Sequence, residues 1–177
     1  MRLVFFGTGR FGLPTLEAIK KSAHTLQAVV TSPDKIQGRG LHIQGSPIKK
    51  WAIENQIPIF QFSSLKSPEV FETLNKMQAD IFVVVAYGFL LPKNILDIPA
   101  IAPLNIHSSL LPRYRGPAPI HWALLNGDTR TGVTVMRMAP ALDTGDILLQ
   151  KELDIHPQES FTSLEERLAN LGAETLT

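Results

Sequence analysis

The sequence predicts an α/β domain of three layers, in which helices cover both faces of a mostly parallel, twisted sheet. Short apolar segments alternate with amphipathic ones along the chain, which is the pattern of such folds. The most apolar segment, residues 81–86, is rich in β-branched residues on both faces, as in a parallel strand between two helical layers. With 177 residues, 44% hydrophobic and 19% charged, the chain has the size and composition of one domain, residues 1–177.

The first half is expected to open with a strand at residues 3–6 that ends in a glycine turn. Pro14 then stands in the first turn of a helix, a position where proline is favoured. A second strand is expected at residues 28–30. Residues 35–45 have no apolar period and contain three glycines, so we expect a loop there.

The remaining elements follow from apolar runs and helical periodicity. A helix begins at residues 46–47, where serine precedes proline. The strand at residues 57–60 contains a proline and is therefore expected near an edge of the sheet. Further strands are predicted at residues 81–86, 104–107, 132–136 and 147–149, and further helices at residues 68–77, 117–125 and 161–176.

The composition excludes several classes of protein. A net charge of +1 gives no overall attraction to nucleic acid or membranes, so any basic binding site must be local. The absence of cysteine excludes disulfides, thiolate zinc sites and a cysteine nucleophile. The longest apolar run, residues 81–91, is shorter than the about 20 residues that span a bilayer. We therefore expect a cytoplasmic protein with no bound metal, no membrane association and no obligate protein partner.

Two polar residues at the end of a predicted strand are the first candidates for catalysis. Asn105 and His107 are two residues apart, so in an extended strand they project from the same face. An amide can stabilise an oxyanion and an imidazole can move a proton, which is what transfer of an acyl group to an amine requires. The alternative is that His107 is a structural histidine.

A third candidate is Asp143, in the segment of residues 142–146. We expect its carboxylate to reach back to His107, where it would fix the orientation of the imidazole and stabilise its charged form. The alternative interpretation is an ordinary Asx turn in which Gly145 supplies a positive φ.

Two further segments have possible ligands. Residues 7–12 match the Gly-x-Gly-x-x-Gly pattern of dinucleotide folds, but the acidic residue expected about 20 residues later is missing, which disfavours NAD. We interpret this segment as a tight turn that lines the expected ligand cleft, on the side where the amine that accepts the acyl group would bind. A second segment contains basic residues that either bind phosphate groups or form part of the solvent-exposed surface: Lys35, Arg39 and Lys49.

Five parts of the sequence resemble one known family: residues 31–34 together with 38–40, 85–92, 105–120, 131–134 and 142–146. This family is the folate-dependent formyltransferases, and the resemblance is narrowest to the N-terminal catalytic domain of those that act on methionyl-tRNA. The resemblance implies a Rossmann-like formyltransferase fold and transfer of a formyl group from 10-formyltetrahydrofolate to the α-amine of initiator methionyl-tRNA.

The resemblance also implies roles for individual residues. Asn105, His107 and Asp143 would be the catalytic triad. Arg39 would contact the acceptor end of the tRNA, with Lys35 and Lys49 nearby. The residues expected to line the folate site are Ser109, Leu110, Leu111 and Pro112.

The resemblance bears on the extent of the chain and leaves two alternatives open. Members of the family that act on tRNA carry a further C-terminal β-barrel domain, so we expect the sequence to be a fragment. A formyltransferase for an amino-sugar nucleotide or a small ribonucleotide is the alternative enzyme. A folate-binding module without turnover is the alternative from another class of protein.

Overall fold

A computed structural model of the chain describes residues 1–37 and 42–177, with the side chains of residues 1–34 and 45–177. The strands are β1 (Arg2–Gly7), β2 (Thr25–Thr31), β3 (Lys35–Gln37), β4 (His42–Gln44), β5 (Ile59–Gln61), β6 (Ile81–Val85), β7 (Ala102–His107), β8 (Arg130–Arg137) and β9 (Ile147–Asp154). The helices are the 3₁₀ turn η1 (Arg10–Gly12), α1 (Leu13–Lys21), α2 (Pro47–Glu54), α3 (Pro68–Lys76), α4 (Lys93–Leu96), α5 (Pro119–Leu125) and α6 (Phe161–Leu176).

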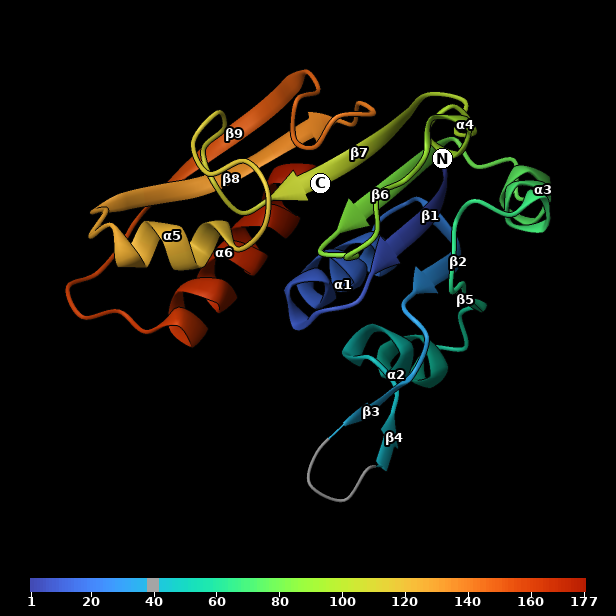
Figure 1. Ribbon diagram of the computed structural model, residues 1–177, viewed down its shortest axis with the longest axis horizontal. Helices are drawn as coiled ribbons and strands as arrows, with labels where there is room; N and C mark the ends of the chain where they lie inside the picture. The colour runs from blue at the N-terminus through green and yellow to red at the C-terminus, as the bar shows by residue number, and fades with distance from the viewer. Residues whose placement is uncertain (38–41) are drawn as a thin grey trace.

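The main sheet has seven strands in the order β5-β2-β1-β6-β7-β8-β9 (Figure 1). The first five strands in that order run parallel to one another, whereas β8 and β9 are antiparallel to their neighbours. The predicted mostly parallel sheet is therefore confirmed. Its antiparallel part ends at β9, an edge strand whose side chains are almost all exposed.

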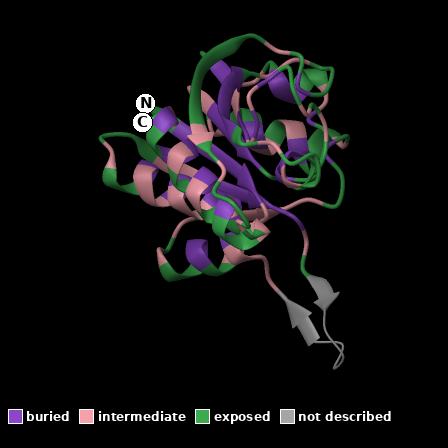
Figure 2. Cartoon of the chain, turned by 90° about the vertical axis from the view of Figure 1, so that its left-hand side faces the viewer, coloured by how far each residue is buried: buried purple, intermediate pink, exposed green. Residues whose placement is uncertain are grey.

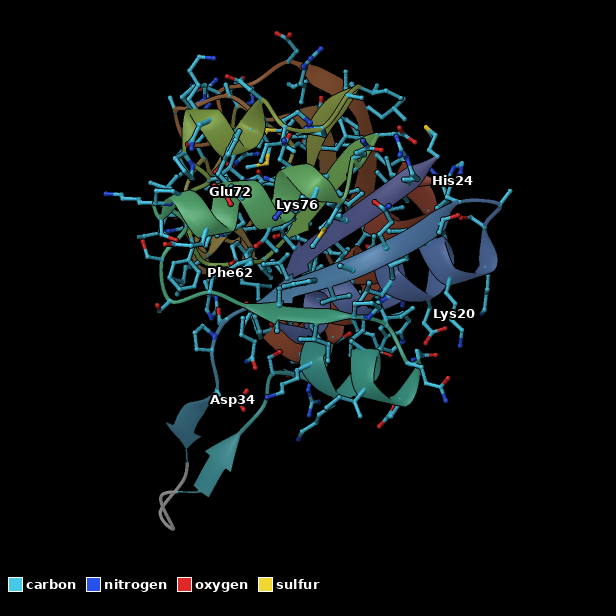
Figure 3. The ribbon with its side chains drawn as sticks, turned by 90° about the vertical axis from the view of Figure 1, so that its right-hand side faces the viewer. Lys20, His24, Asp34, Phe62, Glu72 and Lys76 are labelled. Carbon is cyan, nitrogen blue, oxygen red and sulfur yellow. The ribbon has the colours of Figure 1, made fainter. Side chains whose placement is uncertain are left out.

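The helices cover both faces of this sheet because side chains alternate along each strand. On β1, Leu3 and Phe5 pack into a core with α1, α2 and α6, whereas Val4 and Phe6 pack into a second core with α3 and α4. Figure 3 shows the strands between α3 on one side and α1 and α2 on the other. The buried residues follow these strands through the middle of the molecule (Figure 2). The three-layer prediction is confirmed.

The same alternation sets the direction of the two candidate residues on β7. Ile106 belongs to the core that α6 covers. The contact with α6 is close, since a Cβ built on Gly172 would lie 2.9 Å from Ile106 Cγ2. Asn105 and His107, on either side of Ile106, therefore project from the opposite face. Their neighbours across the ladder on β8 are Met136 and Thr134.

The prediction of a loop at residues 35–45 is wrong for the part of it that the structure describes. Within residues 35–45, β3 and β4 form a two-stranded antiparallel pair, with Lys35 opposite Gln44 and Ile36 opposite Ile43. This pair projects away from the main sheet (Figure 1). A pair of this kind is held by main-chain hydrogen bonds and needs no apolar period, so periodicity did not reveal it. Across the ranges that the structure describes, no helix is long and apolar enough to cross a membrane.

Candidate active site

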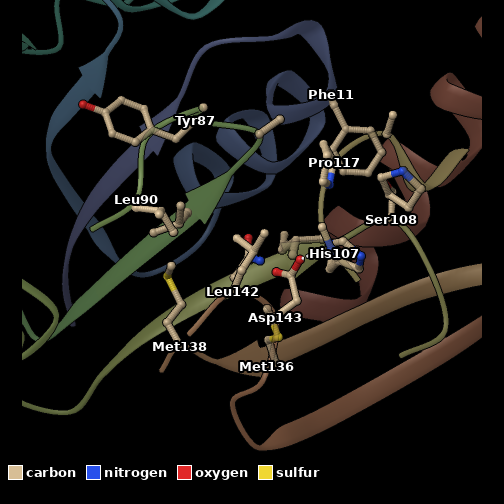
Figure 4. A pocket seen from close by; sticks show the side chains of 18 of the residues that line it. Phe11, Tyr87, Leu90, His107, Ser108, Pro117, Met136, Met138, Leu142 and Asp143 are labelled. Carbon is tan, nitrogen blue, oxygen red and sulfur yellow. Dashed lines mark hydrogen bonds and ion pairs between the residues drawn. The ribbon is translucent and has the colours of Figure 1, made fainter. Parts of the chain in front are cut away.

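Asn105, His107 and Asp143 meet in a cavity of about 590 Å³ at the carboxyl end of β7. All three residues line this cavity. Figure 4 shows His107 and Asp143 side by side in it. In a mostly parallel α/β sheet, the carboxyl edge of the strands is where ligands bind. The expectation that residues 105 and 107 share one face is confirmed.

His107 is held between a carboxylate and a backbone carbonyl. Its Nδ1 lies 3.7 Å from Asp143 Oδ2, so the expectation that Asp143 reaches His107 is confirmed. Its Nε2 lies 2.9 Å from the carbonyl oxygen of Tyr114. Both side chains are buried, with 8% of His107 and 8% of Asp143 exposed. A distance of 3.7 Å allows charge attraction but is longer than a hydrogen bond, so the pair can tighten when the imidazole becomes charged.

Asp143 is positioned by its own loop and by the turn after β7. Its Oδ2 accepts a hydrogen bond of 2.8 Å from the Gly116 N–H. The positive φ in this loop belongs to Asp143, at 51°, and not to Gly145, so that part of the alternative interpretation, an Asx turn, is wrong. Glycine is required at position 145 for a different reason, because a Cβ there would lie 1.7 Å from the Arg137 carbonyl oxygen.

Several residues around the cavity have left-handed backbone conformations. Ala86, Ala118 and Asp143 line it with φ of 47°, 58° and 51°, and Tyr114, which binds His107, has φ of 56°. Such a conformation costs about 1–2 kcal/mol for a residue with a Cβ and persists only where the surroundings impose it. Strained backbone that gathers around one cavity is typical of a functional site.

The cavity extends to both sides of the central His107. On one side its wall is formed by residues 86–91, after β6, and residues 138–142, after β8. Leu90 and Leu142 in this wall are 68% and 53% exposed, so they offer apolar surface to a ligand. The sequence indicated residues 86–91 and Leu142 only through their resemblance to the family, and it did not indicate residues 138–141. Exposed apolar residues directly after buried strands were the physical signal that could have identified them.

On the other side of His107, the wall is formed by aromatic rings and a proline ring, with two polar side chains. Phe11, Pro117 and Phe161 supply the apolar part, and His121 and Glu165 the polar part. The rings of His121 and Phe161 lie 4.2 Å apart between centroids. Phe11 belongs to the glycine-rich segment of residues 7–12, which does turn beside the cavity as expected.

The four residues predicted to bind folate are not among those that line the cavity. Ser109 is fully buried and donates a hydrogen bond of 2.6 Å to the Arg113 carbonyl. The Leu111 N–H donates to Thr134 Oγ1 at 3.1 Å, while Leu110 is partly buried and Pro112 exposed. These contacts shape the segment between β7 and α5. A role in folate binding for the four residues stays a prediction.

Of the three basic residues predicted to bind phosphate groups, Lys49 is the one whose side chain the structure describes. Lys49 Nζ lies 2.5 Å from Asp34 Oδ2. Hydrogen bonds from Lys49 and Gln61 lower the pKa of Asp34, so the charge of Lys49 is already compensated. Arg39 and the side chain of Lys35 lie outside the described part of the chain. Within that part, no three His, Asp or Glu side chains are grouped so that they could hold a metal ion.

Fold and site together define a class of protein. A three-layer α/β domain that brings an amide, an imidazole and a carboxylate into one cavity has the groups needed for acyl transfer. The chain belongs to the formyl transferase family, whose sequence model matches residues 1–177.

Two relatives are similar over nearly the whole chain. It is 49% identical over 174 residues to a methionyl-tRNA formyltransferase of Syntrophus aciditrophicus, covering 98% of this chain and 56% of the relative. It is 50% identical over 176 residues to a methionyl-tRNA formyltransferase of Methylococcus capsulatus, covering 99% of this chain and 57% of the relative. The chain thus spans little more than half the length of these relatives.

Among solved structures, the fold is similar to that of a phosphoribosylglycinamide formyltransferase from Bacillus halodurans. The TM-score is 0.81 at 22% sequence identity, covering 98% of this chain and 90% of that one. At this identity the likeness concerns the fold alone. The Rossmann-like formyltransferase fold expected from the sequence is confirmed.

Proposed function

We propose that this chain transfers the formyl group of 10-formyltetrahydrofolate to the α-amine of methionine esterified to initiator tRNA. The observation that carries the proposal is the convergence of Asn105, His107 and Asp143 in one cavity. The relatives named methionyl-tRNA formyltransferase support the choice of acceptor.

The reaction begins with attack of the neutral amine on the formyl carbon. A C–N bond forms, and the formyl oxygen becomes an oxyanion in the tetrahedral intermediate. The amide N–H of Asn105 stabilises this oxygen by donating a hydrogen bond. Loss of one such donor lowers the rate about 10²–10³-fold in other enzymes.

The proton then moves from the amine nitrogen to the departing folate nitrogen. His107 Nδ1 takes the proton of the attacking amine, because Nε2 is engaged with the Tyr114 carbonyl. The imidazolium formed in this way faces Asp143, which stabilises its charge. Collapse of the intermediate breaks the bond between the formyl carbon and N10, and His107 returns the proton to N10. Formylated amine and tetrahydrofolate result, and the balance requires no metal.

The cavity fits the reacting parts of both substrates. A volume of about 590 Å³ lies within the usual range of small-molecule sites. The exposed apolar wall of residues 86–91 and 138–142 suits a flat heterocyclic ring, and the wall with Phe11, Pro117 and Phe161 suits an apolar side chain on the acceptor. We place the folate on the first side and the aminoacyl group on the second.

Contacts to the tRNA would come from the basic residues around the β3–β4 pair and in α2. Lys35, Arg39 and Lys49 are our candidates for phosphate contacts, and Lys49 would first exchange its ion pair with Asp34. An amino-sugar nucleotide or a small ribonucleotide is the alternative acceptor. It would bring a phosphate toward Glu165, whose carboxylate opposes a second negative charge.

A single-turnover assay with 10-formyltetrahydrofolate tests the proposal. Methionyl-tRNA, an amino-sugar nucleotide and an amino ribonucleotide are offered separately as acceptors. We expect transfer to methionyl-tRNA, reduced about 10²–10³-fold in Asn105→Ala with little change in folate binding. Asn75→Ala, on the exposed side of α3, is the matched control.

The other outcomes contradict one part of the proposal each. Transfer to a phosphate-bearing acceptor alone would keep the chemistry and reject the tRNA. An Asn105→Ala variant as active as Asn75→Ala would reject the oxyanion role. Folate binding without transfer to any acceptor would favour the binding module.

A further inference from the structure

The turn between β7 and α5 supplies a partner to each of two catalytic candidates. The Tyr114 carbonyl lies 2.9 Å from His107 Nε2, and the Gly116 N–H donates to Asp143 Oδ2 at 2.8 Å. These two groups are two residues apart on one short segment. Whatever fixes this segment therefore fixes the imidazole and the carboxylate together.

The contact with Tyr114 decides which nitrogen of His107 carries the proton. A carbonyl oxygen can only accept a hydrogen bond, so Nε2 must be the N–H donor. In the neutral imidazole, Nδ1 is then the unprotonated nitrogen, on the side of Asp143. If the carbonyl moved away, the opposite tautomer would become available, and it presents no lone pair at Nδ1.

The Tyr114 backbone needs an external constraint to keep its carbonyl in this place. Its φ of 56° is a left-handed conformation, which an aromatic residue rarely adopts. Relaxation to a negative φ would rotate the adjoining peptide group. Because the carbonyl belongs to that peptide group, the hydrogen bond to His107 would be lost.

The side chain of Tyr114 provides the constraint. Its hydroxyl donates a hydrogen bond of 2.7 Å to Asp128 Oδ2 and accepts one of 3.0 Å from Asn126 Nδ2. Arg113 Nη2 lies 2.8 and 3.0 Å from the two oxygens of Asp128, and its guanidinium lies 5.1 Å from the centre of the Tyr114 ring. The Asp128 side chain is only 14% exposed, whereas that of Arg113 is 60% exposed, so the hydrogen bond between Tyr114 and Asp128 is the part-buried contact of this group.

We infer that Tyr114 and Asp128 are positioning residues that hold His107 as its Nε2–H tautomer. Their hydrogen bond anchors the Tyr114 side chain and thereby keeps its carbonyl on Nε2. Asp128 follows α5 and is not among the residues that line the cavity. It acts on the reaction only through Tyr114 and His107. The inference deepens the proposed function and rests on it wherever a rate is concerned.

The variants Tyr114→Phe and Asp128→Asn test the inference. The first removes a single oxygen and keeps the ring beside Arg113, and the second keeps the shape of Asp128 without its charge. Asp154→Asn is the matched control, because it changes an exposed carboxylate on the edge strand β9 that pairs with Arg130 and not with Tyr114 or His107.

The first readout is the tautomer of His107, measured by two-bond ¹H–¹⁵N NMR on histidine-labelled protein above the titration range of the imidazole. Substitution of His107 assigns its signals among the five histidines. We expect the Nε2–H form in the parent chain and a shift of the tautomer ratio of about fivefold in both variants, the factor given by one hydrogen bond. Asp154→Asn should match the parent chain.

The second readout is formyl transfer. We expect kcat to fall about five- to twentyfold in both variants, with KM for the folate unchanged within about twofold. A parental tautomer ratio in Tyr114→Phe would overturn the inference, even if Asp128→Asn failed to fold. The NMR result does not depend on turnover. A chain that transfers no formyl group would thus reject the proposed function while the tautomer still decides the positioning role.

Discussion

Replacement of Gly145 by alanine should damage the candidate site through the backbone alone. A Cβ at this position would lie 1.7 Å from the Arg137 carbonyl oxygen and 2.8 Å from the Arg137 carbonyl carbon. Neither atom can move freely, because Arg137 is the last residue of β8 and its N–H donates to the Asp146 carbonyl at 2.9 Å. The loop of residues 139–146 must therefore shift by more than 1 Å to restore a contact of about 3.4 Å.

The size of the effect follows from this displacement. Forcing one extra methyl group into a packed site costs about 1–3 kcal/mol. Asp143 is two residues away and would move with the loop, which lengthens its contacts with His107 and Gly116. A misplacement of about 1 Å at a catalytic group can lower a rate about 10²-fold. We expect kcat of Gly145→Ala to fall about 10–10²-fold and the melting temperature by several degrees.

Single-turnover formyl transfer and thermal unfolding followed by circular dichroism measure the two effects. Gly9→Ala is the matched control, because a Cβ there has nothing within 4 Å and the backbone is extended, with φ of −79°. It should leave the melting temperature unchanged, because no neighbouring atom has to move. If Gly145→Ala behaved like Gly9→Ala, the close approach to Arg137 would not constrain the loop and the reasoning would be wrong.

Two further predictions concern stability. Among the described residues, Tyr87 has a buried hydroxyl with no hydrogen-bond partner, and burial raises the pKa of Tyr87 to about 12. Tyr87→Phe should therefore increase the free energy of unfolding by about 1 kcal/mol. A lower free energy of unfolding, measured by chemical denaturation, would contradict this. Burial raises the pKa of Glu159, but hydrogen bonds from the His156 N–H, Arg167 and Ser163 outweigh it and lower the pKa below 4.5. The stabilisation from Glu159 is thus complete above pH 4.5 and is lost as the pH falls through the lowered value. Glu159→Gln should cost about 1–3 kcal/mol at pH 7 and flatten the decline of the melting temperature in acid, whereas parallel curves for the two proteins would reject the assignment.

The part of the site on β7 could be predicted because a strand has a simple period. Asn105 and His107 share a face whatever the rest of the chain does, and the two-sided apolar segment of residues 81–86 already indicated that their strand lies in a covered sheet. The position of Asp143 was predicted less directly. It depended on the expectation that a turn after a neighbouring strand would come back to the same edge.

The segment between β7 and α5 could not be predicted in the same way. Its conformation depends on contacts between residues distant in sequence, such as the hydrogen bond from Leu111 to Thr134 and that from Tyr114 to Asp128. Neither contact leaves a periodic signal. For residues 109–112 the structure describes bonds that shape the turn, and their contacts with folate, implied by the resemblance to the family, stay a prediction.

The close contact between Gly172 and Ile106 links the two faces of β7. Ile106 stands between the amide and the imidazole in the chain, and α6 lies against it with no room for a larger residue. A side chain at position 172 would press on the strand from behind and tilt the two polar groups on its other face. The chemistry on one face of β7 thus limits which residue the helix on the other face can carry, although the full thickness of the sheet separates them.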